Sequence, residues 1–245
     1  MTENWRYLLL DNINFWVPNF SIFADHIEDK MNTLGLVDYH PHKSRIFSFI
    51  DCTTFEISKP NDPVTQRAMY SGHKKIHAIK FQIVGLPNGM QFHVSLPDSA
   101  RRHDSFLLSQ SKILQTLNQI QEGAEEENKF RMHGDPAYAN HLYLSGGDLG
   151  EIRVVIEQDI GEAKEFYKLV NYERLLQIKK TKVSLICFMI LVLHDIYVCL
   201  NGSKVGRYFN LAAPSLEEWT IQGPKKVALE SGEDDNDDDF IDLEN

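Results

Sequence analysis

The sequence contains few cysteines, and they are scattered. Among 245 residues there are three, Cys52, Cys187 and Cys199, and no two of them form a C-x-x-C pair. This odd number with no paired spacing argues against a disulfide framework and against a cysteine-based zinc site. It favours a reducing, intracellular compartment. The first residues also lack the basic stretch and the cleavage site of a secretory signal, so we expect no export.

The sequence also lacks an excess of positive charge. Its formal net charge is −10, from 25 lysines and arginines and 35 acidic residues. Nine of these acids lie in residues 230–245, and removing them from the 35 leaves 26, which almost balances the 25 basic residues. We therefore expect a nearly neutral body. We also predict a disordered, solvated acidic tail, because this segment has too little apolar surface to fold.

One apolar run is long enough to cross a bilayer, the segment VSLICFMILVLHDIYVCL at residues 183–200. His194 and Asp195 lie inside it, and charged groups in the hydrocarbon layer cost free energy. We therefore predict a buried core helix, at about residues 175–200, and no membrane partner.

The rest of the chain alternates between strand and helix patterns. Apolar residues at helical spacing predict helices over residues 20–34, 101–120 and 148–170. Runs of apolar and β-branched residues predict strands near residues 46–57 and 130–133, and a hairpin over 77–97 that turns at Pro-Asn-Gly. This order predicts an α/β domain with a mixed sheet flanked by helices.

Three acidic residues occupy positions suited to chemistry. Asp51 lies within the first strand, Asp135 follows a strand in the turn Gly-Asp-Pro, and Glu157 lies on the next helix. Each alone has an ordinary explanation as a turn, capping or solvated residue. Together they would supply the hard oxygen ligands that Mg²⁺ or Mn²⁺ prefers, and such ions promote phosphoryl transfer. Gly161, four residues after Glu157, predicts close packing of this part of the helix.

Five sequence blocks occur in the order known from one protein family. They are IDCT (50–53), YSGHKKIH (70–77), RRHDS (101–105), GDPAY (134–138) and VVIEQDIGEAK (154–164). In these blocks the chain resembles the Harbinger-type DDE transposases and their domesticated, nuclease-like relatives. The resemblance extends from about Phe20 to about Leu216.

The resemblance implies an RNase H-like fold and a DNA endonuclease that cleaves phosphodiesters through a DDE triad. Carried over by motif, Asp51, Asp135 and Glu157 are the catalytic residues and the ligands of Mg²⁺ or Mn²⁺. The first would bridge two ions, and the other two would each hold one side. The family also implies a location in the nucleus, with the cytoplasm as a second compartment.

The resemblance also suggests a division of the chain into three parts. The nuclease domain would cover residues 20–216, after a remnant at 1–19 and before an extension at 217–245 that ends in the acidic tail. The family usually has a helix-turn-helix region before the nuclease domain, so the chain resembles a truncated copy. We therefore expect weak, non-specific binding to DNA by the chain alone, and a separate DNA-binding protein as a partner.

Basic residues in two of the blocks are candidates for contacts with DNA phosphates. They are His73, Lys74, Lys75, Arg101 and Arg102. The alternative for the two lysines is a solvated basic loop.

Asp104, in the block RRHDS, has two interpretations. It is either a fourth acid near the metal ions or the N-cap of the helix that begins there, and we favour the cap.

Three departures from the family pattern favour a second hypothesis. Cys52 stands where the family usually has glycine, the segment between Asp135 and Glu157 is shorter, and little chain precedes residue 20, where the family usually has its helix-turn-helix region. Ile160 also stands where the family has an aromatic residue. These departures suggest a catalytically inactive, domesticated domain that keeps the fold as a surface for binding protein or DNA. The sequence leaves both hypotheses open.

Overall fold

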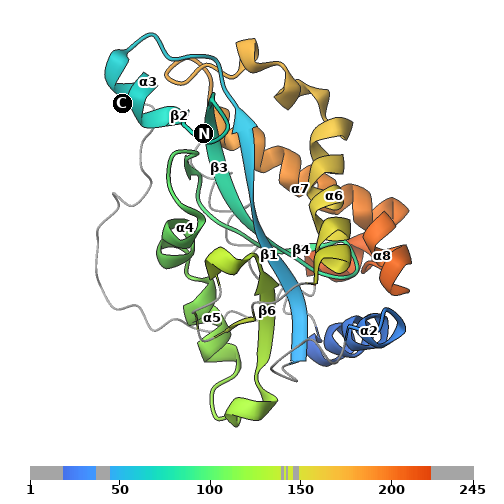
Figure 1. The fold of residues 1–245 in the computed structure, drawn as a ribbon. Coiled ribbons are helices and arrows are strands. Elements are labelled where there is room, and N and C mark those ends of the chain that lie inside the picture. Colours follow the sequence, from blue (N-terminus) through green and yellow to red (C-terminus); the bar gives the residue numbers. More distant parts are fainter. Residues whose placement is uncertain (1–18, 37–44, 139–140, 142, 146–148, 222–245) are drawn as a thin grey trace.

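The computed structural model describes residues 19–36, 45–138, 141, 143–145 and 149–221 (Figure 1). The predicted remnant, apart from residue 19, and the acidic tail at 230–245 lie outside the described residues.

A seven-stranded sheet forms the centre of the fold. Its central strand is β1 (Arg45–Glu56), which pairs antiparallel with β3 (Ile76–Gly85) and parallel with β6 (Phe130–Gly134). The remaining strands are β2 (Tyr70–Ser71), β4 (Gln91–Val94) and β5 (Asp98–Ser99), which pair with β3, and β7 (Leu144–Ser145), which pairs with β6. The mixture of parallel and antiparallel pairs confirms the predicted mixed sheet and is consistent with an RNase H-like fold.

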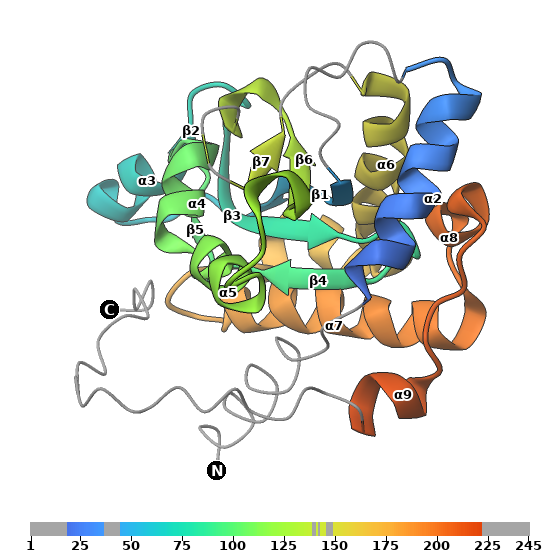
Figure 2. The ribbon, with the colours of Figure 1, turned by 90° about the horizontal axis from the view of Figure 1, so that it is seen from below.

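Helices flank this sheet on both sides, as predicted (Figures 1 and 2). On one side lie α4 (Asp104–Gln110) and α5 (Ile113–Ile120). On the other lie α6 (Gly150–Phe166), α7 (Val183–Asn201) and α8 (Lys204–Phe209), while α2 (Phe20–Thr33) packs against β1. Two further short helices are α3 (Pro63–Met69) and α9 (Leu216–Ile221).

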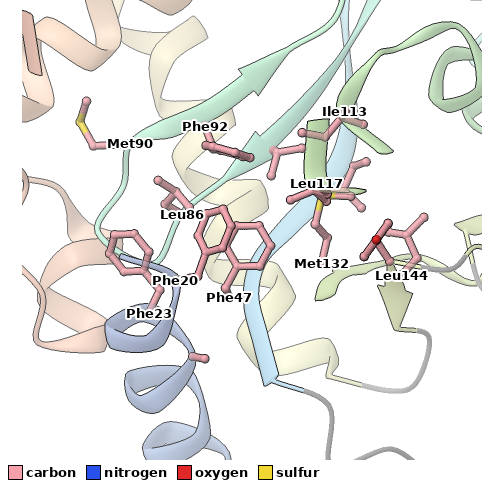
Figure 3. Packing of buried hydrophobic residues seen from close by; sticks show 14 of the residues in the cluster. Phe20, Phe23, Phe47, Leu86, Met90, Phe92, Ile113, Leu117, Met132 and Leu144 are labelled. Atoms are coloured by element: carbon pink, nitrogen blue, oxygen red, sulfur yellow. The ribbon is translucent and has the colours of Figure 1, made fainter. Parts of the chain in front are cut away.

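The strand β1 is buried on both faces over its first half, where Phe47, Phe49 and Ile50 are each at most 1% exposed. Such continuous burial is expected for a strand between two helical layers. The rings of Phe20 and Phe47 lie 4.1 Å apart between centroids, and Phe92 meets Phe20 edge to face (Figure 3). Each buried aromatic ring stabilises the fold by about 2 kcal/mol relative to an exposed one. This cluster therefore anchors α2 to the sheet.

The predicted hairpin forms between β3 and β4, and its turn requires glycine. Gly89 has φ +87°, in the left-handed region that favours glycine. A Cβ at this position would also lie 2.1 Å from Ser203 Oγ, at the start of α8. The turn is therefore both a local bend and a contact between distant parts of the chain.

Two helix predictions were wrong in extent. The predicted helix over 101–120 consists of α4 and α5, because Ser111 between them is extended, with ψ 142°, and its hydroxyl donates to Leu108 O at 3.0 Å. The last predicted helix begins at Val183 rather than at 175. Before it, the Thr181 hydroxyl donates to Gln177 O at 3.1 Å. Serine and threonine side chains that bond to the nearby backbone compete with helix formation.

Helix α7 is long and apolar enough to cross a membrane by length and composition alone. In this fold it packs against the sheet, and half of its most apolar window is buried. Asp195 is 1% exposed, and its Oδ1 accepts a hydrogen bond from Gln91 N of β4 at 3.0 Å. These are the contacts expected of the predicted core helix, and the carboxylate of Asp195 is hydrogen-bonded inside the protein.

Candidate active site

The parallel pairing of β1 and β6 puts the first two predicted acids on neighbouring segments of the chain. Phe49 pairs with His133 in this register, and Asp51 and Asp135 lie two positions further along each chain. Neighbouring strands lie about 4.8 Å apart, and side chains two residues apart point to the same face. The rings of Phe49 and His133 meet at 6.0 Å between centroids. Asp51 therefore belongs to the face of the sheet on which the Phe49 ring lies, while Asp135 is the first residue after β6, in the turn.

The turn after β6 explains the glycine and the proline beside Asp135. A Cβ on Gly134 would lie 2.7 Å from Ile50 Cγ2 and 2.7 Å from a ring carbon of Tyr138, so a larger residue would force the packing apart. Tyr138 N donates to Asp135 O at 2.9 Å and closes a 3-10 turn that begins at Pro136. Gly-Asp-Pro is thus a turn and, at the same time, the element that ends β6 beside β1.

Helix α6 runs beside β1 and carries the third acid (Figure 1). Burial raises the pKa of Asp51 to about 6. The backbone hydrogen bond from Cys52 lowers this pKa, while the negative charge of Glu157 raises it further. Glu157 is therefore close enough to Asp51 for their charges to interact. One turn earlier, Arg153 Nη1 donates to Glu157 Oε1 at 2.9 Å, and its charge lowers the pKa of Asp51.

The donor chemistry suits Mg²⁺ or Mn²⁺, because Asp51, Asp135 and Glu157 all supply carboxylate oxygens. Among the described residues, however, no group of three or more His, Cys, Asp or Glu side chains is arranged to hold a metal ion. One reason is visible at Glu157, whose Oε1 is bound to Arg153. The three carboxylates are thus chemically suitable as ligands, but one of them, Glu157, is paired with Arg153.

Two lysines meet at Thr54, three residues after Asp51. Lys74 Nζ donates to Thr54 Oγ1 at 2.9 Å, and Lys164 Nζ donates to Thr54 O at 2.7 Å. Burial lowers the pKa of Lys164 to about 8, and the positive charge of Lys74 lowers it further. The sequence interpretation missed Lys164. Its signal was the position two helical turns after Glu157, which puts both residues on one face of α6.

A protein-family model described as DDE superfamily endonuclease matches residues 50–195, more than half of the chain. The chain belongs to the DDE superfamily endonuclease family. Neither the search of curated proteins nor the search of solved structures found a match. The family generally uses divalent metals, and the matched range includes all three predicted acids.

In this DDE-family domain, the remaining predicted DNA contacts lie at the surface. His73, Lys74 and Lys75 are exposed in the turn between β2 and β3, and Arg101 and Arg102 are exposed before α4. Exposure is what a contact with DNA phosphate requires, so these five residues stay candidates.

The prediction that Asp104 caps α4 is wrong. The cap residue is His103, without a side-chain cap bond, and Asp104 is the first residue of the helix. Its Oδ1 instead accepts a hydrogen bond from Lys80 Nζ of β3 at 2.6 Å. A hydrogen bond to a charged partner is stronger than one to a backbone N–H, so the Asp104 carboxylate pairs with Lys80 instead of capping the helix. The charge of Asp104 still makes a small contribution to raising the pKa of Asp51.

Cys52, the first departure from the pattern of the endonuclease family, leaves the strand regular. It pairs with Gln82 across the sheet, and its Sγ lies 3.3 Å from Tyr138 Oη. Burial raises the pKa of its thiol to about 12, so the thiol is neutral and a poor nucleophile. Cys52 therefore serves as a packing residue on the face opposite Asp51.

The prediction of close packing at Gly161 is wrong. Among the described residues, no atom lies within 4 Å of a Cβ placed there. This glycine leaves open space on α6 between Glu157 and Lys164.

Proposed function

We propose that this chain is a divalent-metal-dependent DNA endonuclease domain of Harbinger transposon origin. Asp51, Asp135 and Glu157 are its DDE triad. The observation that supports this most is the parallel β1–β6 register in a chain of the DDE superfamily, because Asp51 and Asp135 each follow one position after the last pair of that register, Ile50 with Gly134. The influence of Glu157 on the pKa of Asp51 supports the choice of the third member.

The three carboxylates would hold Mg²⁺ or Mn²⁺, which when bound lowers the pKa of water and neutralises charge on the phosphate oxygens. Lys74 and Lys164 lie beside Thr54 and would bind the phosphates of the DNA strand. Water would attack the phosphorus, the bond to O3′ would break, and the strand would end in a 3′-OH. Burial and the negative charge of Glu157 both disfavour ionised Asp51, and a bound cation would offset this by favouring the ionised form.

A second candidate function is that of a catalytically inactive domain used as an interaction module for protein or DNA. It is favoured by the ion pair of Glu157 with Arg153 and by the absence, among described residues, of a preformed three-acid metal group.

For either function we propose a location in the nucleus and a separate protein that supplies selectivity for a DNA sequence. The nearly equal numbers of acids and bases before residue 230 support the need for such a partner. Electrostatic attraction to phosphate alone would then be weak.

A plasmid assay separates the two functions. The purified chain is incubated with supercoiled plasmid and either Mg²⁺ or Mn²⁺, and nicked circles are measured against time. The endonuclease hypothesis expects nicking that EDTA stops and that Asp51→Asn abolishes. No nicking by a folded wild-type protein would leave the interaction module as the function. Nicking that persists in Asp51→Asn would indicate a contaminating nuclease.

A further inference from the structure

The ion pair between Arg153 and Glu157 engages one acid of the proposed site. Its two atoms are 2.9 Å apart, and the side chains are 33% and 36% exposed. The charge of Arg153 also acts on Asp51 of the facing strand. One guanidinium therefore pairs with one of the three acids from which a metal site would be built and acts electrostatically on a second.

Helix α6 carries a second ion pair that makes no such contact. Glu162 Oε1 binds Lys204 Nζ of α8 at 2.9 Å, and the side chain of Lys204 is 68% exposed. Glu162 accounts for a shift in the pKa of Lys204 and none in that of Asp51. The two pairs have equal length on one helix, and only the pair of Arg153 concerns the triad.

We propose that Arg153 is an internal counter-ion that competes with the metal for Glu157, and that a DNA phosphate releases this acid by taking Arg153 as its own partner. The inference rests on the proposed function, since it assigns a regulator to the same metal site. It makes the site poor at binding metal until DNA arrives.

The chemistry of arginine supports the exchange. A guanidinium forms two parallel hydrogen bonds with a phosphate as readily as with a carboxylate. The pair is partly exposed, so little free energy holds it together and a competing anion can displace it. Lys74 and Lys164, both bonded to Thr54 near Asp51, would draw a phosphate toward this part of the sheet.

A consequence of the exchange is that metal and DNA assist one another. If DNA raises the affinity for the metal by some factor, the metal must raise the affinity for DNA by the same factor. The coupling depends on Arg153, so removing its charge should raise the affinity for metal and abolish the dependence on DNA.

The test is a titration of the full chain with Mn²⁺, in which the free ion is followed by electron paramagnetic resonance, with and without a short DNA duplex. A duplex-only titration corrects for ions bound by DNA. We expect Arg153→Gln to bind Mn²⁺ about tenfold more tightly than wild type without DNA, because a unit positive charge beside a divalent ion is removed. DNA should raise the affinity of wild type by about the same factor and leave Arg153→Gln unchanged.

Two further variants make the result specific. Lys204→Gln breaks the matched ion pair of α6 and should behave as wild type. Arg153→Lys keeps the charge and should retain the weak DNA-free affinity, which also guards against an Arg153→Gln protein that folds poorly.

The outcomes distinguish this inference from the proposed function. If wild type binds Mn²⁺, Asp51→Asn does not, and Arg153→Gln matches wild type or binds more weakly, the counter-ion role is wrong and the metal site stands. If wild type and Arg153→Gln both bind no more Mn²⁺ than Asp51→Asn, with or without DNA, there is no metal site and both proposals fail.

Discussion

At the scale of single residues, the main feature is the carboxylate of Asp51, whose ionised form is unfavourable in the folded protein. Asp51 lies on a central strand, where burial comes first among the causes that raise its pKa from 3.8 to about 6. The neighbouring Glu157 adds to this rise. Residues that are unfavourable for stability and adjacent to like charges are typical of functional sites.

Asp51→Asn should therefore stabilise the metal-free protein near neutral pH. Because its folded pKa is raised, ionised Asp51 lowers the free energy of unfolding above about pH 6, and this penalty disappears as pH falls toward the unfolded value of 3.8. We expect a gain on the order of 2 kcal/mol near neutral pH and almost none at about pH 4. Urea unfolding at both pH values measures it, and an equal gain at both would contradict this account of Asp51.

The triad makes a second prediction at this scale. A metal that binds only the folded protein raises its melting temperature. At Mn²⁺ concentrations high enough to overcome the competition of Arg153, Mn²⁺ should stabilise the wild type, and Asp51→Asn, Asp135→Asn and Glu157→Gln should each lose most of this gain. The control is Asp104→Asn, whose carboxylate pairs with Lys80 and should not be needed.

Differential scanning fluorimetry with and without Mn²⁺ gives the result. If only Asp51 and Asp135 matter, Glu157 is displaced from the site and the inactive domain becomes the better hypothesis. If all four variants respond as wild type does, the carboxylates form no metal site.

At the scale of elements, close contacts decide where glycine is needed. The β3–β4 turn at Gly89 meets the first residues of α8, and the turn after β6 at Gly134 meets Ile50 of β1 and the ring of Tyr138. Both turns connect local conformation to long-range packing. The second also ends the strand that precedes Asp135, so its packing supports the proposed site.

Gly89→Ala should be strongly destabilising, by about 3 kcal/mol, because it combines left-handed backbone strain with a clash. The added Cβ would lie 2.1 Å from Ser203 Oγ. Gly35→Ala is the matched control, since Gly35 has φ +69° and no described atom within 4 Å of an added Cβ. It should cost only the strain, about 1 kcal/mol. Equal losses for the two variants in urea unfolding would show that the clash relaxes freely.

At the scale of the whole molecule, charge is divided between the body and the last residues. The nine acids after residue 229 carry most of the net charge of −10. The exposed lysines near the proposed site, Lys74 and Lys75, offer a surface of opposite sign. Acidic residues of the same chain can therefore compete with DNA for these lysines.

Deletion of residues 230–245 should raise the affinity for DNA at low salt. The effect should fade as salt is added, because mobile ions screen interactions between exposed charges. Fluorescence anisotropy with a labelled duplex, in a salt series, compares the deletion with the full chain. An affinity that does not change at low salt would refute the competition. Tight, sequence-selective binding by the full chain alone would instead contradict the proposed need for a DNA-binding partner.

The sequence by itself determined the order of the main elements and nominated the three candidate acids. Local patterns can be recognised without knowledge of the fold. They include the runs of apolar and β-branched residues in β1 and β6 and the helical spacing in α6. The motif around Asp51 and the turn Gly-Asp-Pro belong to the segments that the parallel β1–β6 pairing makes neighbours. The predicted extent was wrong at Ser111, where the hydroxyl donates to the nearby carbonyl of Leu108 and the backbone is extended.

Only the tertiary structure decided what surrounds those acids. The pairing of Asp104 with Lys80 joins residues 24 positions apart, and Lys164 reaches Thr54 across 110 positions. The charge of Arg153 reaches Asp51 only because α6 packs against β1. No local pattern encodes such contacts, because they depend on the register of parallel strands and on which helix covers which face of the sheet.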